Sequence, residues 1–146
     1  MQFLLSALNT APKGRSLFRR AAYIVALLLL PLTSVCAARD VNLAEAFQAM
    51  QTADSDFHIV DVRSRQEYEQ GHVPGAINMD VADPNFPLML QELPKNASVV
   101  VYCRSGRRSA VAVRIMESLG YIRILHMKDG WLAWEKAGLP SEKQAH

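Results

Sequence analysis

The order of apolar and polar positions predicts strands and helices that alternate along the chain. Short apolar runs, typical of strands buried on both faces, occupy residues 57–62, 76–79, 99–102 and 122–125. Segments with apolar residues at helical spacing, or with a polar residue suited to cap a helix, lie between them and predict helices over residues 43–50, 65–70, 88–93, 107–119 and 131–137. This alternation indicates an α/β fold, with a parallel central sheet that carries helices on both faces.

Polar caps, a glycine and a proline mark the boundaries of these elements. Asn42 precedes the first helix and Ser64 the second, and both residue types accept hydrogen bonds from a helix start. Gly120 follows the fourth helix, where a left-handed residue ends many helices. We expect the proline-containing segment 83–87 to be a connection, and the residues near Arg39-Asp40 to form a short linker.

The first 37 residues have the pattern of a secretory signal peptide. Basic residues are followed by a run of 12 apolar residues, 21–32, and by small residues that suit cleavage after Ala37 or Ala38. The run is shorter than the ~20 residues of a spanning helix, which favours a cleaved signal peptide. An uncleaved membrane anchor is the alternative. The apolar run disfavours a transit peptide, and the valine before Cys36 disfavours a lipoprotein signal. We therefore expect export, to the bacterial periplasm, with an anchored form facing the same side.

Loss of this leader changes the charge and the cysteine content. The whole chain of 146 residues has a net charge of +2, but the part after residue 37 holds 12 basic and 14 acidic residues. This balance removes the support for a nucleic-acid partner. The remaining length suits one domain, over residues 41–140, with a tail of residues 141–146. Its single cysteine, Cys103, suggests a reactive thiol in an oxidising compartment, whereas a buried inert cysteine is the structural alternative.

Cys103 opens a basic loop that joins a buried strand to a predicted helix. Backbone N–H groups and the dipole at such a helix start favour negative charge. The loop also holds three arginines, at positions 104, 107 and 108. Both features stabilise a thiolate, which is the reactive form of cysteine. Because parallel sheets bind ligands beyond the carboxyl ends of their strands, the sequence predicts a nucleophile that receives an anionic group.

Three segments of the chain resemble the rhodanese family of sulfurtransferases. In order, they are Asp61-Val62-Arg63 with Glu67-Tyr68 and residues 71–78, then residues 100–110 around Cys103, then residues 130–134 with Gly138-Leu139-Pro140. The resemblance covers about residues 41–140 and implies a single rhodanese-like domain. The chain differs from the family pattern at Lys128-Asp129-Gly130, where members often have a pair of glycines at the pocket rim.

The resemblance implies a sulfur transfer through Cys103. The thiolate would take the outer sulfur of thiosulfate or a similar anionic donor, release sulfite, and pass the sulfur from a persulfide to cyanide, a thiol or a protein. The loop residues implied in binding are Arg104, Ser105, Gly106, Arg107 and Arg108. Among them, Arg104 and Arg108 are expected to contact the donor's oxygens, with Arg107 evenly balanced between that role and solvent. The resemblance implies no cofactor.

The length of the loop separates sulfur transfer from phosphoryl transfer. Cys103 to Arg108 gives a six-residue Cys-x4-Arg loop, whereas related phosphatases and arsenate reductases resemble Cys-x5-Arg, with room for a tetrahedral oxyanion. The shorter loop favours a single bound sulfur. A non-catalytic persulfide carrier or binding module is the first alternative, and a phosphatase or arsenate reductase the second. A membrane would be a partner only through an uncleaved N-terminal segment.

The remaining polar and aromatic candidates favour structural roles. Asp61 and Arg63 are expected to form an ion pair or to bind loop backbone near the site. His72 lies in a glycine- and proline-rich turn, where hydrogen bonding is favoured over general base catalysis. The other histidines show no metal-ligand spacing, so no metal site is predicted. Trp131 and Trp134 are expected to pack the last helix, with Trp131 also a candidate for the pocket wall.

Overall fold

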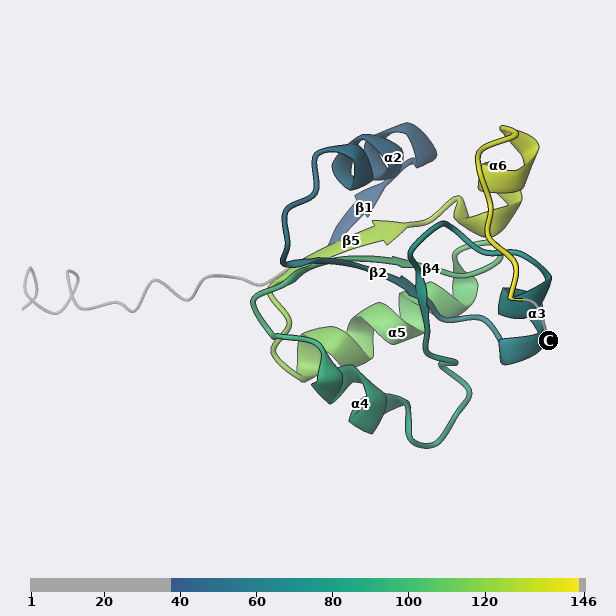
Figure 1. Cartoon of the computed structure of the whole chain (residues 1–146). Helices are drawn as coiled ribbons and strands as arrows, with labels where there is room; N and C mark the ends of the chain where they lie inside the picture. The colour runs from purple at the N-terminus through teal and green to yellow at the C-terminus, as the bar shows by residue number, and fades with distance from the viewer. Residues whose placement is uncertain (1–37, 145–146) are drawn as a thin grey trace, which may run out of the picture. The chain divides into compact units, whose positions relative to one another are not determined.

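Five parallel strands form one sheet at the centre of the computed structural model, which describes residues 38–144 (Figure 1). The strands are β1 (Arg39–Val41), β2 (Phe57–Asp61), β3 (Ile77–Asn78), β4 (Ser98–Tyr102) and β5 (Arg123–Met127), in the order β1-β5-β4-β2-β3. The middle strand β4 pairs with β5 on one side and β2 on the other. It ends one residue before Cys103, so the most buried strand of the sheet leads directly into the basic loop.

The edge strand β1 corrects one expectation from the sequence. The predicted linker at Arg39-Asp40 instead pairs in parallel with the last three residues of β5. A three-residue edge strand carries too few positions to show a pattern of alternation, and its hydrogen bonds come from a strand that is distant in the sequence.

The predicted signal peptide and anchor of residues 1–37 lie outside the described residues. Within residues 38–144, no helix has the length and apolar character needed to cross a membrane.

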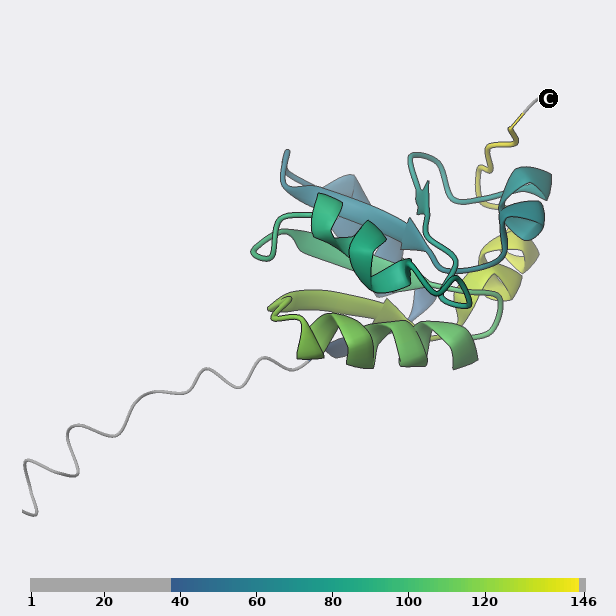
Figure 2. The same ribbon diagram turned by 90° about the horizontal axis from the view of Figure 1, so that it is seen from below.

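Helices cover both faces of the sheet, as predicted. On one face lie α2 (Leu43–Gln51) and α6 (Gly130–Lys136); on the other lie α5 (Arg107–Ser118), α4 (Phe86–Met89) and the 3-10 turn η1 (Leu90–Glu92) (Figures 1 and 2). The short helix α3 (Arg65–Gln70) stands beyond the end of β2. Asn42 and Ser64 cap α2 and α3, each within a reciprocal capping box closed by a glutamate three residues later.

Most predicted elements differ from the observed ones by one residue at an end, and α4 and β5 differ by two. Helix α4 begins at Phe86, two residues before the predicted start, so that Pro87 lies in its first turn. A proline is tolerated there because the first N–H groups of a helix have no partner within it. Strand β5 covers residues 123–127, since Ile122 is 55% exposed and the pairing continues through His126 and Met127.

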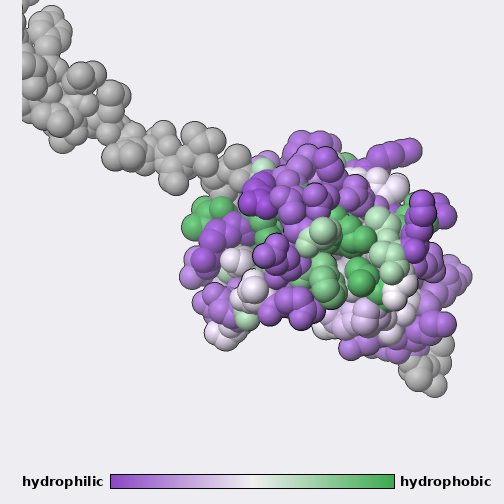
Figure 3. Space-filling view, turned by 90° about the horizontal axis from the view of Figure 1, so that it is seen from above, coloured by the Kyte–Doolittle hydropathy of each residue, from purple (hydrophilic) through white to green (hydrophobic). Residues whose placement is uncertain are grey.

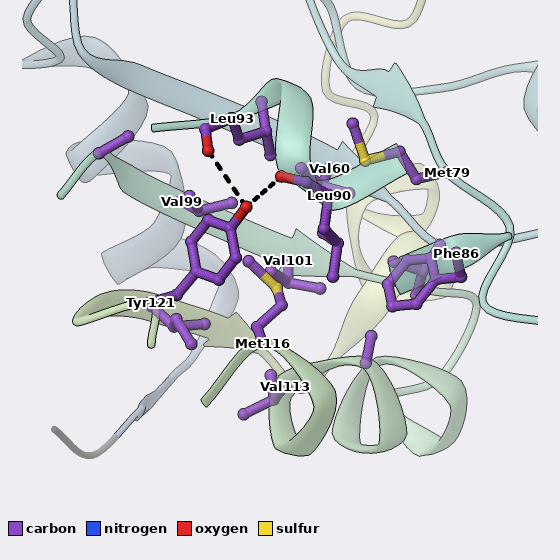
Figure 4. Close-up of a cluster of buried hydrophobic side chains, with 14 of the residues drawn as sticks. Val60, Met79, Phe86, Leu90, Leu93, Val99, Val101, Val113, Met116 and Tyr121 are labelled. Atoms are coloured by element: carbon purple, nitrogen blue, oxygen red, sulfur yellow. Dashed lines mark hydrogen bonds between the residues drawn. The ribbon is translucent and has the colours of Figure 1, made fainter. Parts of the chain in front are cut away.

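Alternating side chains of the central strand divide the core into two layers. Val99 and Val101 point to the layer under α4 and α5, and Val100 and Tyr102 to the layer under α2 and α6. Figure 4 shows the first layer, in which the Tyr121 hydroxyl donates to the backbone oxygens of Leu90, in η1, and Leu93. Burial on both faces explains why β4 is an unbroken apolar run in the sequence.

The face that carries α2 and α6 also bears an apolar groove. Seen from above, this face shows a hydrophobic area framed by hydrophilic side chains (Figure 3). The groove there is lined by Phe47, Met50, Gln51, Ile59, Val73, Pro74, Trp134 and Pro140. It shares no lining residue with the cavity at Cys103, so it is separate from the candidate active site.

Candidate active site

Cys103 lies in the turn between β4 and α5, at the carboxyl end of the sheet. Its residue is only 1% exposed, and its thiol forms no disulfide. A cavity of about 230 Å³ opens over it, lined by Cys103, Arg104, Ser105, Arg107 and Arg108. The structure therefore brings together at one cavity four of the five loop residues predicted to bind the donor, together with the predicted nucleophile.

The fifth, Gly106, gives the loop its shape. It precedes the first residue of α5 with φ of +84°, and a Cβ at this position would lie 2.3 Å from the backbone oxygen of Lys128. Gly130, with φ of +65°, also lies against the loop, because a Cβ added at this position would lie 2.6 Å from the Arg104 backbone oxygen. Only glycine fits such positions. The backbones of the loop and of the start of α6 therefore touch, and Trp131 N–H donates to the Cys103 oxygen at 2.8 Å.

Hydrogen bonds around the sulfur favour the thiolate. Burial of Cys103 opposes its ionisation, but the Ser109 hydroxyl and the backbone N–H groups of Ser109, Ser105 and Arg108 outweigh that effect and lower the pKa of the thiol below its ordinary value. The Ser109 Oγ lies 3.5 Å from the sulfur. Neutral donors aimed at one atom form an anion cradle, so the loop stabilises charge on Cys103.

The three loop arginines have different environments. Arg108 is half-buried and makes a two-pronged ion pair with Glu67 of α3, with Nη1–Oε2 and Nη2–Oε1 distances of 2.6 and 2.8 Å. The side chains of Arg104 and Arg107 are exposed at the cavity. Two guanidinium groups thus face the cavity without an ion pair in the described structure, while that of Arg108 is held by α3.

Asp61 and Arg63 form the buried ion pair expected from the sequence. The Arg63 Nη2 lies 2.6 Å from Asp61 Oδ2 and also donates to the Gly71 oxygen at 2.6 Å, with both residues at most 2% exposed. The Arg63 guanidinium also stacks 4.8 Å from the centre of the Trp131 ring. Paired and stacked in this way, Arg63 ties the end of β2 to the 71–76 loop and to α6.

The turn histidine and the two tryptophans also have the structural contacts expected of them. The His72 Nδ1 lies 2.8 Å from the Tyr68 backbone oxygen, and its ring stacks on that of Tyr68 at 3.6 Å. Trp134 packs against Phe47 across the α2–α6 contact. Trp131 lines a second cavity, of about 210 Å³, which shares Arg104 with the cavity at Cys103. Trp131 therefore belongs to the wall beside the site.

Sequence reasoning missed a histidine in contact with the site. The His126 Nε2 lies 2.9 Å from Ser109 Oγ, and its Nδ1 lies 2.8 Å from Asp40 Oδ1. His126 is 17 residues from Ser109 and 86 from Asp40 in sequence, so no local spacing signals this contact. Among residues 38–144, no three or more histidine, cysteine, aspartate or glutamate side chains lie close enough together to bind a metal ion.

Curated proteins with similar sequences include sulfurtransferases. A sulfurtransferase of Allochromatium vinosum is 39% identical over 85 residues, covering 58% of this chain and 78% of that protein. The putative sulfur carrier protein YrkF of Bacillus subtilis is 32% identical over 90 residues, covering 62% and 48%. The thiosulfate sulfurtransferase PspE of Escherichia coli is 37% identical over 67 residues, covering 46% and 64%. The chain thus spans about half to four fifths of these relatives.

Solved structures and a family model agree with the sequence relatives. The solution structure of the rhodanese-like domain of Alr3790 from Anabaena matches with a TM-score of 0.65 and 26% identity, covering 74% of this chain and 81% of that one. The model of the rhodanese-like domain matches residues 43–137, which include the Cys103 loop and every strand except β1. With its parallel sheet and its cysteine loop between β4 and α5, the chain belongs to the rhodanese-like domain family.

Proposed function

We propose that this protein transfers sulfane sulfur from thiosulfate, or a similar anionic donor, to a thiophilic acceptor through a persulfide on Cys103. The observation that carries the proposal is the buried Cys103 sulfur, at which the Ser109 hydroxyl and three backbone N–H groups converge, all within the seven residues 103–109. Sulfurtransferases among the relatives support the reaction class, and the name of PspE supports thiosulfate as donor.

The reaction takes two displacement steps at one sulfur. The Cys103 thiolate attacks the outer sulfur of thiosulfate, the S–S bond of the donor breaks, and sulfite leaves with the electron pair. The loop N–H groups that donate to the Cys103 sulfur would also stabilise the negative charge of the persulfide formed there. An acceptor such as cyanide or a thiolate attacks that outer sulfur, and Cys103 leaves as a thiolate, ready for another turnover.

The exposed arginines are suited to bind the donor's oxygens. A guanidinium fork matches an oxyanion, and Arg104 and Arg107 present theirs at the cavity. Arg108, also predicted to bind the donor, contributes positive charge while Glu67 occupies its Nη atoms. We therefore propose that Arg104 makes the main contact, that Arg107 assists, and that Arg108 holds the loop in place.

Export is proposed from the N-terminal sequence alone. The basic segment, the short apolar run and the small residues near Ala37 support cleavage and delivery to the periplasm. Cell fractionation, with N-terminal sequencing of the recovered protein, tests this. A cytoplasmic protein that keeps its first residues would contradict it, and an intact protein in the membrane fraction would support the anchor.

Sulfite release from thiosulfate in the presence of cyanide tests the proposed reaction. We expect turnover by the purified, uncleaved chain and none by Cys103→Ser, whereas Cys36→Ser, which changes the other cysteine of the uncleaved chain, should keep full activity. Normal turnover by Cys103→Ser would refute the proposed nucleophile. An aryl phosphate and arsenate, offered in parallel, should be neither hydrolysed nor reduced.

Intact-mass measurement separates an enzyme from a carrier. After thiosulfate treatment, the protein should gain the mass of one sulfur atom, and cyanide should remove it repeatedly. A carrier would gain the same mass but would not turn over with small acceptors; this alternative is considered because one relative, YrkF, is named a putative sulfur carrier protein. Absence of the mass gain with every donor tried would count against both functions.

A further inference from the structure

A hydrogen-bonded chain leads from Cys103 to a solvent-exposed carboxylate. Ser109 Oγ lies 3.5 Å from the Cys103 sulfur and 2.9 Å from His126 Nε2, and the other ring nitrogen of His126 lies 2.8 Å from Asp40 Oδ1. Ser109 is fully buried and His126 is 7% exposed, whereas the Asp40 side chain is 66% exposed. The buried thiol is thus connected to the surface through one hydroxyl and one imidazole ring.

The fold assembles this chain from parts that are distant in the sequence. Asp40 and His126 are register partners on β1 and β5, and paired residues of neighbouring strands project from the same face of a sheet. Ser109 lies on the buried face of the first turn of α5, which follows the Cys103 loop. The edge strand β1, outside the segment matched by the family model, therefore supplies the group that holds His126.

The donors and acceptors in the chain can be assigned from their chemistry. An ionised carboxylate only accepts, so His126 Nδ1 donates to Asp40. In a neutral ring Nε2 is then an acceptor, and the Ser109 hydroxyl donates to it. In a protonated ring Nε2 donates to Ser109, whose single proton becomes available to the Cys103 sulfur or to the Gly106 oxygen, 3.0 Å away. The protonation of His126 thus decides where the Ser109 proton points.

We propose that His126, held by Asp40, accepts the proton of the Cys103 thiol through the Ser109 hydroxyl. The thiol S–H bond breaks as its proton bonds to Ser109 Oγ, while the original Ser109 proton moves to His126 Nε2. The products are a thiolate that accepts a hydrogen bond from Ser109 and an imidazolium that donates to Ser109 and Asp40. This inference rests on the proposed role of Cys103 as a nucleophile. His126 and Asp40 act on the sulfur only through Ser109, as positioning residues.

The charges around the chain suit this transfer. The groups that face His126 are Asp40 from β1, Ser109 from α5 and, through Ser109, Cys103 from the end of β4. Asp40 balances the positive charge of the imidazolium. The guanidinium of Arg108, although paired with Glu67, also attracts the charge on Cys103 and so favours the thiolate. Each charge formed by the transfer therefore has an opposite charge near it.

The alkylation of Cys103 by iodoacetamide, followed across pH by the mass of the peptide that holds it, tests the relay without a sulfur donor. His126→Gln removes the proton acceptor, and we expect alkylation at neutral pH to slow about tenfold, the factor for losing one hydrogen bond to a charged group. Asp40→Asn, at a side chain that is 66% exposed, should slow it less. In both variants the thiolate absorbance should appear at higher pH. His58→Gln, a histidine change on β2, is the matched control and should behave as wild type.

A double variant separates the relay from a structural effect. Ser109→Ala should slow alkylation at least as much as His126→Gln, and the pair should be no slower than Ser109→Ala alone, because His126 reaches the sulfur only through that hydroxyl. Ser109→Thr, which keeps the hydroxyl, should restore the rate. Wild-type titration of Cys103 in His126→Gln, or losses that add in the double variant, would overturn the relay. If the variants slow alkylation as expected but the wild-type protein transfers no sulfur, the relay would stand and only the proposed function would be contradicted.

Discussion

Replacing Glu67 by glutamine removes an ion pair that ties α3 to the Cys103 loop. The Glu67 oxygens accept from both Nη atoms of Arg108, at 2.6 and 2.8 Å. Oε2 also accepts from the backbone N and the Oγ of Ser64, at 3.2 and 3.1 Å, which closes the capping box of α3. Glutamine keeps an acceptor for the cap but loses the charge that faces Arg108. The substitution therefore isolates the contribution of the ion pair.

The pKa of Glu67 sets the expected size of this effect. The hydrogen bond from Arg108 is the largest cause of its shift; burial opposes it, Ser64 adds to it, and the pKa falls from 4.5 to about 2. At about 1.4 kcal/mol for each pKa unit, the upper limit is roughly 3.4 kcal/mol. Because the Arg108 and Glu67 side chains are 37% and 29% exposed, solvent screens their attraction. We expect Glu67→Gln to lower the free energy of unfolding by about 1 to 2 kcal/mol at neutral pH.

The effect should depend on pH in one direction. A carboxyl whose pKa is lower in the folded than in the unfolded state stabilises the fold above its unfolded pKa, and this stabilisation is lost as the pH falls through the folded pKa. The difference in the free energy of unfolding between wild type and Glu67→Gln should therefore have its full size at neutral pH. It should shrink as the pH falls from about 4.5 to about 2. Urea unfolding at several pH values, followed by the fluorescence of Trp131 and Trp134, measures it.

A neighbouring glutamate provides the control for this measurement. Glu69 pairs with Arg65 at 2.6 Å on the same helix, but the Arg65 side chain is 61% exposed. Glu69→Gln should therefore cost less than about 0.5 kcal/mol. If Glu67→Gln costs no more than this control, or if its cost is unchanged at about pH 3, the ion pair does not fix α3. The Ser64 cap and apolar packing would then hold the helix alone.

Two further substitutions test the scaffold of the site. Asp61→Asn should lower the free energy of unfolding by about 3 to 5 kcal/mol, because it leaves the buried charge of Arg63 with a neutral partner; an unchanged urea midpoint would show that the Gly71 carbonyl is sufficient. Gly106→Ala should slow alkylation of Cys103 and sulfite release, because its Cβ would lie 2.3 Å from a backbone oxygen. Gly120→Ala, also at a positive φ but with open space around its Cβ, should keep both activities; equal losses in the two variants would contradict the proposed contact.

The parts of the fold that rest on local sequence were predictable. The capping boxes of α2 and α3 need residues only three positions apart, and the apolar run of β4 reports burial without any knowledge of its neighbours. The site loop was predictable for the same reason, since Cys103 and the N–H groups around it lie within seven consecutive residues. Helix α4 and strand β5 were displaced by a residue or two, because packing and pairing decide where their ends lie.

The sequence by itself determined the fold class, the place of Cys103 between a strand and a helix, and the length of the loop that follows it. Only the tertiary structure decided what surrounds that loop. The ion pair of Arg108 joins residues 41 apart, and the chain through Ser109, His126 and Asp40 joins residues 17 and 86 apart. Such contacts follow from strand order and register, which place β1 beside β5 and β5 beside β4. The spacing of residues along the chain does not predict these contacts, because they form only once the sheet has formed.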